Sequence, residues 1–372
     1  MPKLKERSSI LLRCRADIGS EQIACVRLDA DEGIWESTDL RFNGDLAALC
    51  AMLSFSAEEK ELLRDNLREA GFDSTSLEAL DNSDPARIGI AFAAKRLKGA
   101  VLIAAVLRGT QGAEWFSNFR IGYAAEHKGF AIAADYAEGR LAEYLRTVVN
   151  DGEVRFLVTG YSRGGAAANL LARRLCDRFG TDRVRCYTVA SPNTVIARRS
   201  ASYDCIHNLV REEDFFTRVP LSDWGYTKYG NIVVLGGDIR ESYREISGDA
   251  YIGFTDKSAV EAVIKAISTL APNVPAYYKR RHPVGERALS LYDYMLHVAE
   301  ILSDQADENT GEVIFDSMVS EFSDLSAFLS SGMDVSALLA PAEGIPRCSV
   351  ADSHSPAAYL GAMQNAGLLR CM

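Results

Sequence analysis

The chain has 372 residues, enough to bury a large core, and its 48% hydrophobic and 25% charged content is ordinary for a globular protein. A formal net charge of −10 leaves no basic excess to neutralise phosphates, which excludes nucleic acid as the main partner. No apolar stretch approaches the ~18 residues of a membrane span, and the first residues lack the apolar core of an export signal. We therefore expect a cytoplasmic protein.

Eight cysteines are scattered along the chain without a C-x-x-C pair or a metal-like cluster. In a reducing compartment such cysteines behave as small buried hydrophobes. We expect no metal and no cofactor.

The predicted elements begin with two short strands within residues 1–35. Helical patterns follow at 43–72, where Ser56 and Glu59 have the spacing of a capping box. Residues 88–96 and 101–109 predict a pair of strands, and the second is almost wholly apolar, as a central strand should be.

A long helix is predicted at 127–150, then a short apolar strand that ends near residue 158 and a helix from residue 166. Two further buried strands are predicted at 185–192 and 205–212. Alternation of buried strands with helices predicts an α/β fold with a mainly parallel sheet and a mixed N-terminal edge.

One pentapeptide between strand and helix, Gly160-Tyr161-Ser162-Arg163-Gly164, matches G-x-S-x-G. In this context the serine sits on a sharp turn that projects Oγ clear of the backbone, and the glycines let strand and helix pass closely. The helix N-terminus favours the negative charge that develops in acyl transfer. The pattern predicts Ser162 as a nucleophile with Gly160 and Gly164 shaping its elbow; an ordinary glycine turn is the alternative.

A serine nucleophile needs a histidine base, and four histidines follow Ser162. His207 lies in an apolar strand and His297 in the middle of a predicted helix, both typical of core packing. His282 follows a cationic cluster typical of a solvated face. His354 lies in a polar loop that opens a helix, which is how a base is presented to a site.

The acid that orients the histidine is expected on a loop after a strand. Asp214 falls just past the end of the predicted strand 205–212, where open α/β sheets keep their sites. Four other carboxylates remain alternatives: Glu212, Glu213, Asp223 and Asp238.

Taken together, these motifs resemble the class 3 lipases of the α/β-hydrolase superfamily. The matching stretches are a strand-R-G-T segment followed by Glu114-Trp115, an H-x-G-F at 127–130, a G-x-S-x-G-G elbow, a D-x-x-x-x-x-P from Asp214, an aromatic-glycine segment at 224–231 and an H-x-x-x-x-Y from His354. They follow the family's order over residues 88–240 and 350–364.

The resemblance implies an α/β-hydrolase fold with Ser162 as nucleophile, His354 as base and Asp214 as orienting acid. It also implies an oxyanion hole from Thr110 and the backbone N–H of Arg163. Arg163 departs from the family, which often has an apolar residue or histidine there, but its backbone donor is retained.

A long interval separates the acid from the base: His354 comes 140 positions after Asp214 (354 − 214), whereas Asp214 comes 52 positions after Ser162 (214 − 162). Much of that interval has helical patterns. We expect an α/β-hydrolase core at 1–240, a helical cap or lid at 241–345 and a C-terminal core segment at 346–372 that carries His354.

The expected activity is hydrolysis of a carboxylic ester through a serine acyl-enzyme. Lipid acyl esters are the favoured substrates, with transient contact to a membrane or micelle surface. Two alternatives remain: a thioesterase that acts on small acyl substrates, and a non-catalytic hydrolase-like domain that binds a partner. The ordered Ser, Asp and His argue against the second.

Overall fold

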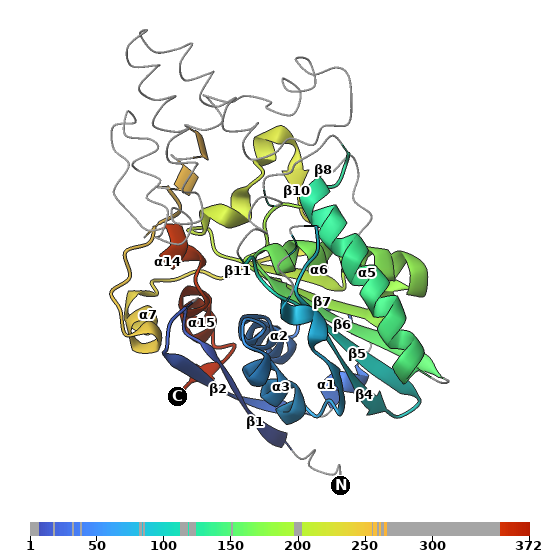
Figure 1. Ribbon diagram of the computed structural model, residues 1–372. Helices are drawn as coiled ribbons and strands as arrows, with labels where there is room; N and C mark the ends of the chain where they lie inside the picture. The colour runs from blue at the N-terminus through green and yellow to red at the C-terminus, as the bar shows by residue number, and fades with distance from the viewer. Residues whose placement is uncertain are drawn as a thin grey trace.

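The computed structural model describes residues 7–265, with short gaps, and residues 350–372 (Figure 1). The gaps are 18, 32, 38, 82–83, 85, 112–117, 119–123, 150–151, 197–202, 255, 259 and 262–263. Most of the predicted cap, 266–345, lies outside the described residues, as do His282 and His297.

A seven-stranded sheet forms the centre of the molecule, in the order β11-β9-β7-β6-β5-β4-β3. Its strands are β3 (Ser74–Ser76), β4 (Ile90–Leu97), β5 (Ala100–Leu107), β6 (Glu153–Tyr161), β7 (Val184–Val189), β9 (Ile206–Val210) and β11 (Asn231–Val234). The strands from β5 to β11 pair in parallel, whereas β4 pairs antiparallel with both β3 and β5. The prediction of a mainly parallel sheet with a mixed edge is confirmed.

Both faces of this sheet are covered, which explains why β5 is apolar throughout and buried at every residue. Helices α5 (Lys128–Val148) and α6 (Arg163–Phe179) pack on one face, and α2 (Gly44–Ser56) packs on the other (Figure 1). Strands separated by helices that lie on both faces of a parallel sheet, with the elbow after β6, make this an α/β-hydrolase fold.

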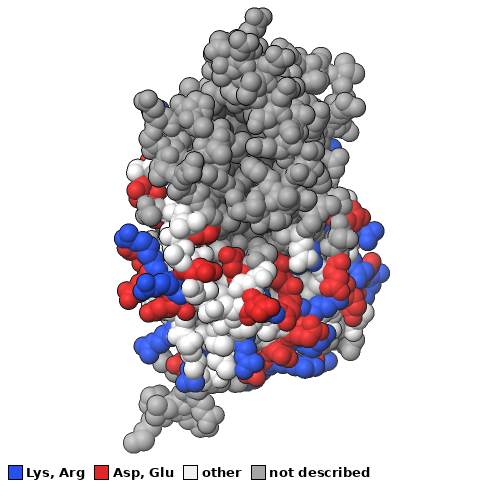
Figure 2. Space-filling view, turned by 60° about the vertical axis from the view of Figure 1, so that its left-hand side comes forward, with Lys and Arg blue, Asp and Glu red and all other residues white. Residues whose placement is uncertain are grey.

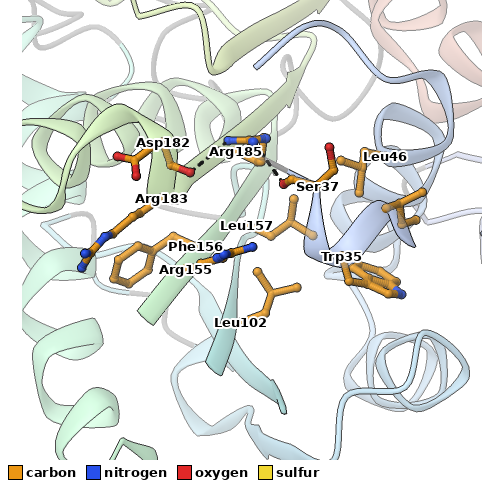
Figure 3. Close-up of a pocket in the computed structure, with 11 residues that line it drawn as sticks. Trp35, Ser37, Leu46, Leu102, Arg155, Phe156, Leu157, Asp182, Arg183 and Arg185 are labelled. Atoms are coloured by element: carbon orange, nitrogen blue, oxygen red, sulfur yellow. Dashed lines mark hydrogen bonds between the residues drawn. The ribbon is translucent and has the colours of Figure 1, made fainter. Parts of the chain in front are cut away.

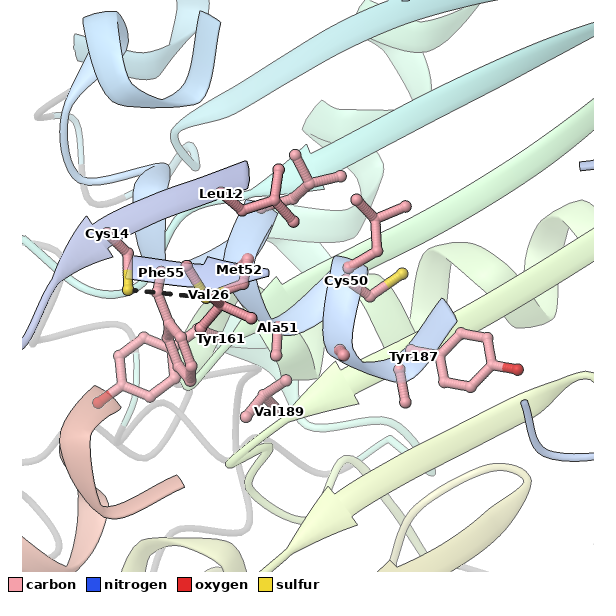
Figure 4. Close-up of a cluster of buried hydrophobic side chains, with 14 of the residues drawn as sticks. Leu12, Cys14, Val26, Cys50, Ala51, Met52, Phe55, Tyr161, Tyr187 and Val189 are labelled. Atoms are coloured by element: carbon pink, nitrogen blue, oxygen red, sulfur yellow. Dashed lines mark hydrogen bonds between the residues drawn. The ribbon is translucent and has the colours of Figure 1, made fainter. Parts of the chain in front are cut away.

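Helix α2 is buried from Leu46 to Ser56, because a second, smaller sheet covers its other side. That sheet is antiparallel and contains β1 (Arg7–Arg15), β2 (Ile23–Asp31) and the C-terminal β12 (Arg370–Cys371). Figure 4 shows the resulting core, in which Leu12, Val26 and Met52 lie beside Phe55 and Tyr161. A helix apolar on all sides needs such a partner on each side.

The predicted capping box at Ser56 is wrong. Ser56 is the last residue of α2, where its hydroxyl donates to the carbonyl of Leu53 at 3.0 Å. Helix α3 (Lys60–Glu69) begins after Glu59, which has the extended backbone of an N-cap but makes no side-chain capping bond. The apolar run that favours α2 carries the helix through Ser56, so that residue cannot also start the next one.

The remaining elements connect these layers. They are α1 (Gly33–Glu36), η1 (Glu78–Asp81), η3 (Thr181–Arg183), β8 (Val195–Ile196), η4 (Phe215–Arg218), η5 (Ser222–Trp224), β10 (Tyr226–Thr227), α7 (Arg240–Ser247), α14 (Val350–His354) and α15 (Pro356–Asn365). In the described residues, no helix combines the length and the apolar character needed to cross a membrane.

Helix α7 opens the range predicted as a cap, and it packs on the core. Its Tyr243 and Ile246 belong to the same buried cluster as α15, and Ser242 donates to the side-chain oxygen of Asn365 at 3.0 Å.

On the face seen in Figure 2, acidic and basic side chains are interspersed over the described part of the surface.

Candidate active site

Ser162 lies on the turn between β6 and α6, with φ 55° and ψ −123°. Positive φ is strained for a residue with a side chain, and such strain persists only where the surroundings hold it. The Ser162 N–H donates to the carbonyl of Val189 at 3.0 Å, and its carbonyl starts the hydrogen-bonding of α6. The turn is therefore held from both β7 and the helix.

Two glycines make this turn sterically possible. A Cβ on Gly160 would lie 2.3 Å from the carbonyl oxygen of Gly164, and a Cβ on Gly164 would lie 2.2 Å from that of Leu107. Both distances are far below van der Waals contact, and both obstacles are backbone. The predicted elbow glycines are thus required by close packing of β5, β6 and α6.

His354 ends α14, and its ring bridges two of the predicted site residues. Nε2 lies 2.9 Å from Ser162 Oγ and Nδ1 lies 2.8 Å from Asp214 Oδ2. An ionised carboxylate only accepts hydrogen bonds, so Nδ1–H donates to Asp214 and Nε2 is left to accept from the serine.

Aromatic rings and a buried hydroxyl hold this histidine. Its ring stacks with Tyr161 at 5.2 Å between centroids and lies 4.7 Å from the ring of Phe216. The Tyr161 hydroxyl donates to the backbone carbonyl of His354 at 2.6 Å. Ser355 then caps α15 by accepting from the N–H of Ala358, which fixes the chain after the histidine.

Asp214 is fully buried after β9, and its carboxylate accepts three hydrogen bonds. Oδ2 accepts from His354 and from the Tyr359 hydroxyl at 2.7 Å, and Oδ1 accepts from the N–H of Phe216 at 3.0 Å. Burial, and then the neighbouring Asp214 carboxylate, raise the pKa of Tyr359, so its hydroxyl stays a donor.

Thr110 follows β5, and Arg163 begins α6. The close approach of Gly164 to the carbonyls of Leu107 and Arg108 puts these two segments side by side. Thr110 Oγ1 accepts from Asn118 at 2.9 Å. The guanidinium of Arg163 is buried and donates to the carbonyl of Arg87 at 2.7 Å, so the side chain points away into the fold while the backbone N–H stays at the helix start.

The other candidate acids and bases have different surroundings. Glu212 pairs with Lys257, Glu213 pairs with Arg211, Asp238 pairs with Arg240, and Asp223 is exposed. His207 is buried in β9 and its Nε2 lies 3.0 Å from the carbonyl of Leu40, as expected of a core histidine. Among the described residues, no three His, Cys, Asp or Glu side chains converge as metal ligands.

A cavity of about 310 Å³ has in its wall two residues that lie close in sequence to site residues. Gln111, next to Thr110, and Pro356, two residues after His354, form parts of its wall. Four carboxylates and one guanidinium also line it, namely Asp17, Glu21, Glu58, Glu59 and Arg15. The lining of this cavity is therefore largely acidic.

A second cavity lies at the amino-terminal ends of the central strands, where Arg155 and Arg185 lie near the starts of β6 and β7 (Figure 3). Its volume of about 20 Å³ is room for about one water molecule. Arg185 donates to the carbonyl of Ser37 at 3.2 Å, so this cluster ties α1 to the sheet.

Sequence reasoning missed the supporting residues of the site. Tyr359 stands in the quoted H-x-x-x-x-Y stretch, five residues after His354, and that motif was the available signal. Tyr161 directly precedes Ser162 in the sequence, and Phe216 lies two residues after Asp214. No local pattern, however, indicates that their rings would pack against His354.

Part of the chain matches a known protein family. Residues 105–224 match the family model described as "Lipase (class 3)". The chain matches no curated protein.

Several solved structures are similar in part. A triacylglycerol lipase with a serine protease triad is 18% identical over 40% of this chain, with a TM-score of 0.31; the match spans 63% of that lipase. A lipase from Rhizopus microsporus var. chinensis is 15% identical, over 51% of this chain and 73% of that one, with a TM-score of 0.38. The Rhizomucor miehei lipase in its propeptide complex is 17% identical, over 63% and 76%, with a TM-score of 0.37.

Proposed function

We propose that this chain, whose residues 105–224 match the class 3 lipase family model, is a serine hydrolase that cleaves carboxylic esters through an acyl-enzyme. The observation that carries the proposal is the hydrogen-bonded series of Ser162, His354 and Asp214, with distances of 2.9 and 2.8 Å. A serine on a strained elbow beside a histidine that a buried carboxylate orients is the arrangement that activates a hydroxyl for attack.

In the proposed reaction, Ser162 Oγ attacks the ester carbonyl while His354 Nε2 takes the hydroxyl proton. Asp214 keeps the imidazole in the tautomer that accepts at Nε2 and stabilises the imidazolium that forms. The tetrahedral intermediate then collapses, and His354 donates its proton to the departing alkoxide. Water attacks the acyl-enzyme by the same route, and the free acid leaves.

The negative oxygen of the intermediate needs donors that are already in position. We assign these to Thr110 and to the backbone N–H of Arg163, which lie on adjacent segments after β5 and at the start of α6. Losing one such donor costs roughly 3 kcal/mol in the barrier, or about a hundredfold in rate.

We propose lipid acyl esters as the substrates, with transient contact to a membrane or micelle surface during turnover. The match to a lipase family supports this substrate class.

We propose on its sequence pattern that 241–345 forms a helical cap, to be tested by limited proteolysis with and without detergent. Seven free thiols among the described residues fit a reducing compartment, and we propose the cytoplasm.

The test is labelling by a fluorophosphonate probe, in buffer and in detergent. Wild type is compared with Ser162→Ala, Asp214→Asn and His354→Ala, and Ser222→Ala on the exposed turn η5 is the matched serine control. We expect labelling of wild type and the control, none in Ser162→Ala and a strong loss in the other two.

Wild type that stays unlabelled in both conditions would overturn the proposal. A series of p-nitrophenyl esters from two to sixteen carbons then tests the substrate class. Activity that rises with chain length and with micelle formation supports a lipid substrate, and activity confined to the shortest esters contradicts it.

A further inference from the structure

Lys228 carries a buried ammonium group that the proposed reaction does not use. It lies between β10 and β11 and is only 6% exposed. Its Nζ donates to Asn193 Oδ1 and to the carbonyl oxygen of Thr217, both at 2.7 Å. Burying a lysine costs free energy unless its charge meets suitable partners, so this placement calls for a reason beyond packing.

The partners of Lys228 belong to the segment that follows Asp214. Lys228 donates to the backbone carbonyl of Thr217, and Asn193 donates to the next three carbonyls. The Asn193 side-chain N–H donates to the carbonyls of Arg218 at 3.3 Å and Pro220 at 2.8 Å. Its backbone N–H donates to the carbonyl of Val219 at 2.9 Å. Because Asn193 Oδ1 accepts from Lys228, its amide nitrogen must face these carbonyls. One lysine and one asparagine thus hold four consecutive carbonyls.

This held segment reaches Asp214 through a single residue. The backbone N–H and hydroxyl of Thr217 both donate to the carbonyl of Asp214, at 3.2 and 2.8 Å. The one-turn helix η4 that connects them also supplies the Phe216 N–H to the Asp214 carboxylate. Any shift of the Thr217 carbonyl therefore moves the carboxylate that orients His354.

The charges around Lys228 are set by the same elements. Burial lowers the pKa of Lys228, the negative charge of Asp214 partly opposes this and Arg218 adds to it, and together they bring the pKa to about 7. The ammonium form is thus fully present in mildly acidic solution and is lost as the pH rises through neutrality.

We propose that Lys228 is a positioning residue for the acid loop: its ammonium holds residues 214–220 in the geometry that keeps Asp214 on His354. The inference rests on the proposed function, since it concerns the same three residues. A neutral amine donates more weakly to carbonyl oxygens than an ammonium, so the loop is held best below the pKa of the lysine.

The experiment measures the second-order rate of fluorophosphonate labelling from pH 5.5 to 9 in the full chain. Lys228→Met keeps the side-chain volume and removes the charge, and Lys257→Met is the matched control at a half-exposed lysine. At pH 6 we expect Lys228→Met to label about tenfold more slowly than wild type, the size of effect that the loss of a charge-assisted hydrogen bond produces.

The pH dependence separates positioning from simple packing. The rates of wild type and Lys228→Met should approach each other above pH 8, because the wild-type amine is then neutral and donates more weakly. Loss of the lysine's packing alone would give a ratio that does not change with pH. Equal rates at pH 6, or a constant ratio, overturn the inference.

A second variant keeps the test decisive if Lys228→Met fails to fold. A guanidinium does not lose its charge in this range, so the ratio of the Lys228→Arg rate to the wild-type rate should rise as the pH passes through neutrality. A ratio that does not rise between pH 7 and 8 also overturns the inference, because the protonation of His354 affects both proteins alike and cancels from it. Wild type that never labels at Ser162 instead contradicts the proposed function, which makes the two failures distinguishable.

Discussion

The hydroxyl of Tyr359 lies 2.7 Å from Oδ2 of Asp214, the same carboxylate oxygen that accepts from His354. Tyr359 and His354 lie 145 and 140 residues after Asp214 in the chain. Helix α15, which follows His354 in the chain, therefore anchors the carboxylate with a second hydrogen bond, from the Tyr359 hydroxyl. The orientation of Asp214 depends on the C-terminal segment as much as on its own loop.

Replacing Tyr359 with Phe removes this anchor and keeps the ring. Hydrogen bonds to charged groups are worth roughly 1.5–3 kcal/mol, so we expect kcat to fall about tenfold or more. KM should change little, because the hydroxyl does not face substrate. Steady-state kinetics on a p-nitrophenyl ester measure both constants.

Tyr203→Phe is the matched control for this variant, since it removes a surface bond of 3.0 Å to Asp177 far from the site. If Tyr359→Phe is as active as Tyr203→Phe, the second anchor has no catalytic consequence.

Tyr161→Phe tests the support of the histidine from the other side. The variant loses the 2.6 Å bond to the His354 carbonyl and leaves that buried acceptor without its hydroxyl donor. We expect a loss of about 1–3 kcal/mol in the free energy of unfolding, together with slower acylation. Urea unfolding measures the first and fluorophosphonate labelling the second; a variant with wild-type stability would contradict the role given to this bond.

Two glycine-to-alanine variants separate elbow geometry from helix propensity. Gly164→Ala puts a Cβ 2.2 Å from the Leu107 carbonyl oxygen, so we expect loss of labelling and destabilisation by several kcal/mol. Gly139 lies in α5, and a Cβ added there would meet nothing within 4 Å, so Gly139→Ala should raise stability by about 0.5–1 kcal/mol. Thermal melting of both variants checks the pair, and a tolerated Gly164→Ala would refute the packing argument.

His127 predicts a dependence of stability on acid pH. Its Nδ1 accepts from the N–H of Phe130 at the start of α5, and burial lowers its pKa from 6.5 to about 3. Between these values the unfolded chain binds a proton that the folded chain rejects, so stability falls as the pH falls from 6.5 towards 3.

Asparagine at position 127 keeps a capping acceptor and removes the titration. Relative to His127→Asn, wild type should therefore lose up to about 1.4 kcal/mol per pH unit across this window. Denaturant unfolding of both proteins at pH 7, 6, 5 and 4 measures the difference. The pKa of His207 is also lowered by burial, but this affects both proteins equally and cancels from the difference. A difference that stays constant with pH would contradict a buried neutral His127.

Much of the central fold could be predicted because it depends on local patterns. Apolar runs marked β5, β6, β7 and β9, and stretches of helix-favouring residues marked α2, α3 and α5. The elbow was readable for the same reason, since strand, glycines, serine and helix lie within a few residues of each other. The capping box failed at Ser56 because two adjacent helices compete for the residues between them, and local spacing does not decide which one takes them.

The pairing of distant segments was decided by tertiary structure. Nothing local indicates that β1 and β2 leave the central sheet and join the C-terminal β12 over α2. The same holds for Tyr359 against Asp214 and for Lys228 among the carbonyls after Asp214.

The sequence by itself determined the elements, the elbow and the candidates for nucleophile, acid and base, because backbone preferences and short motifs act over a few residues. The tertiary structure decided which candidates meet, since Glu212, Glu213, Asp223 and Asp238 are chemically as able as Asp214 to orient a histidine. Only Asp214 among them contacts His354 in the described residues. Its partners are brought together by the packing of β9, α14 and α15, which depends on contacts across more than a hundred residues.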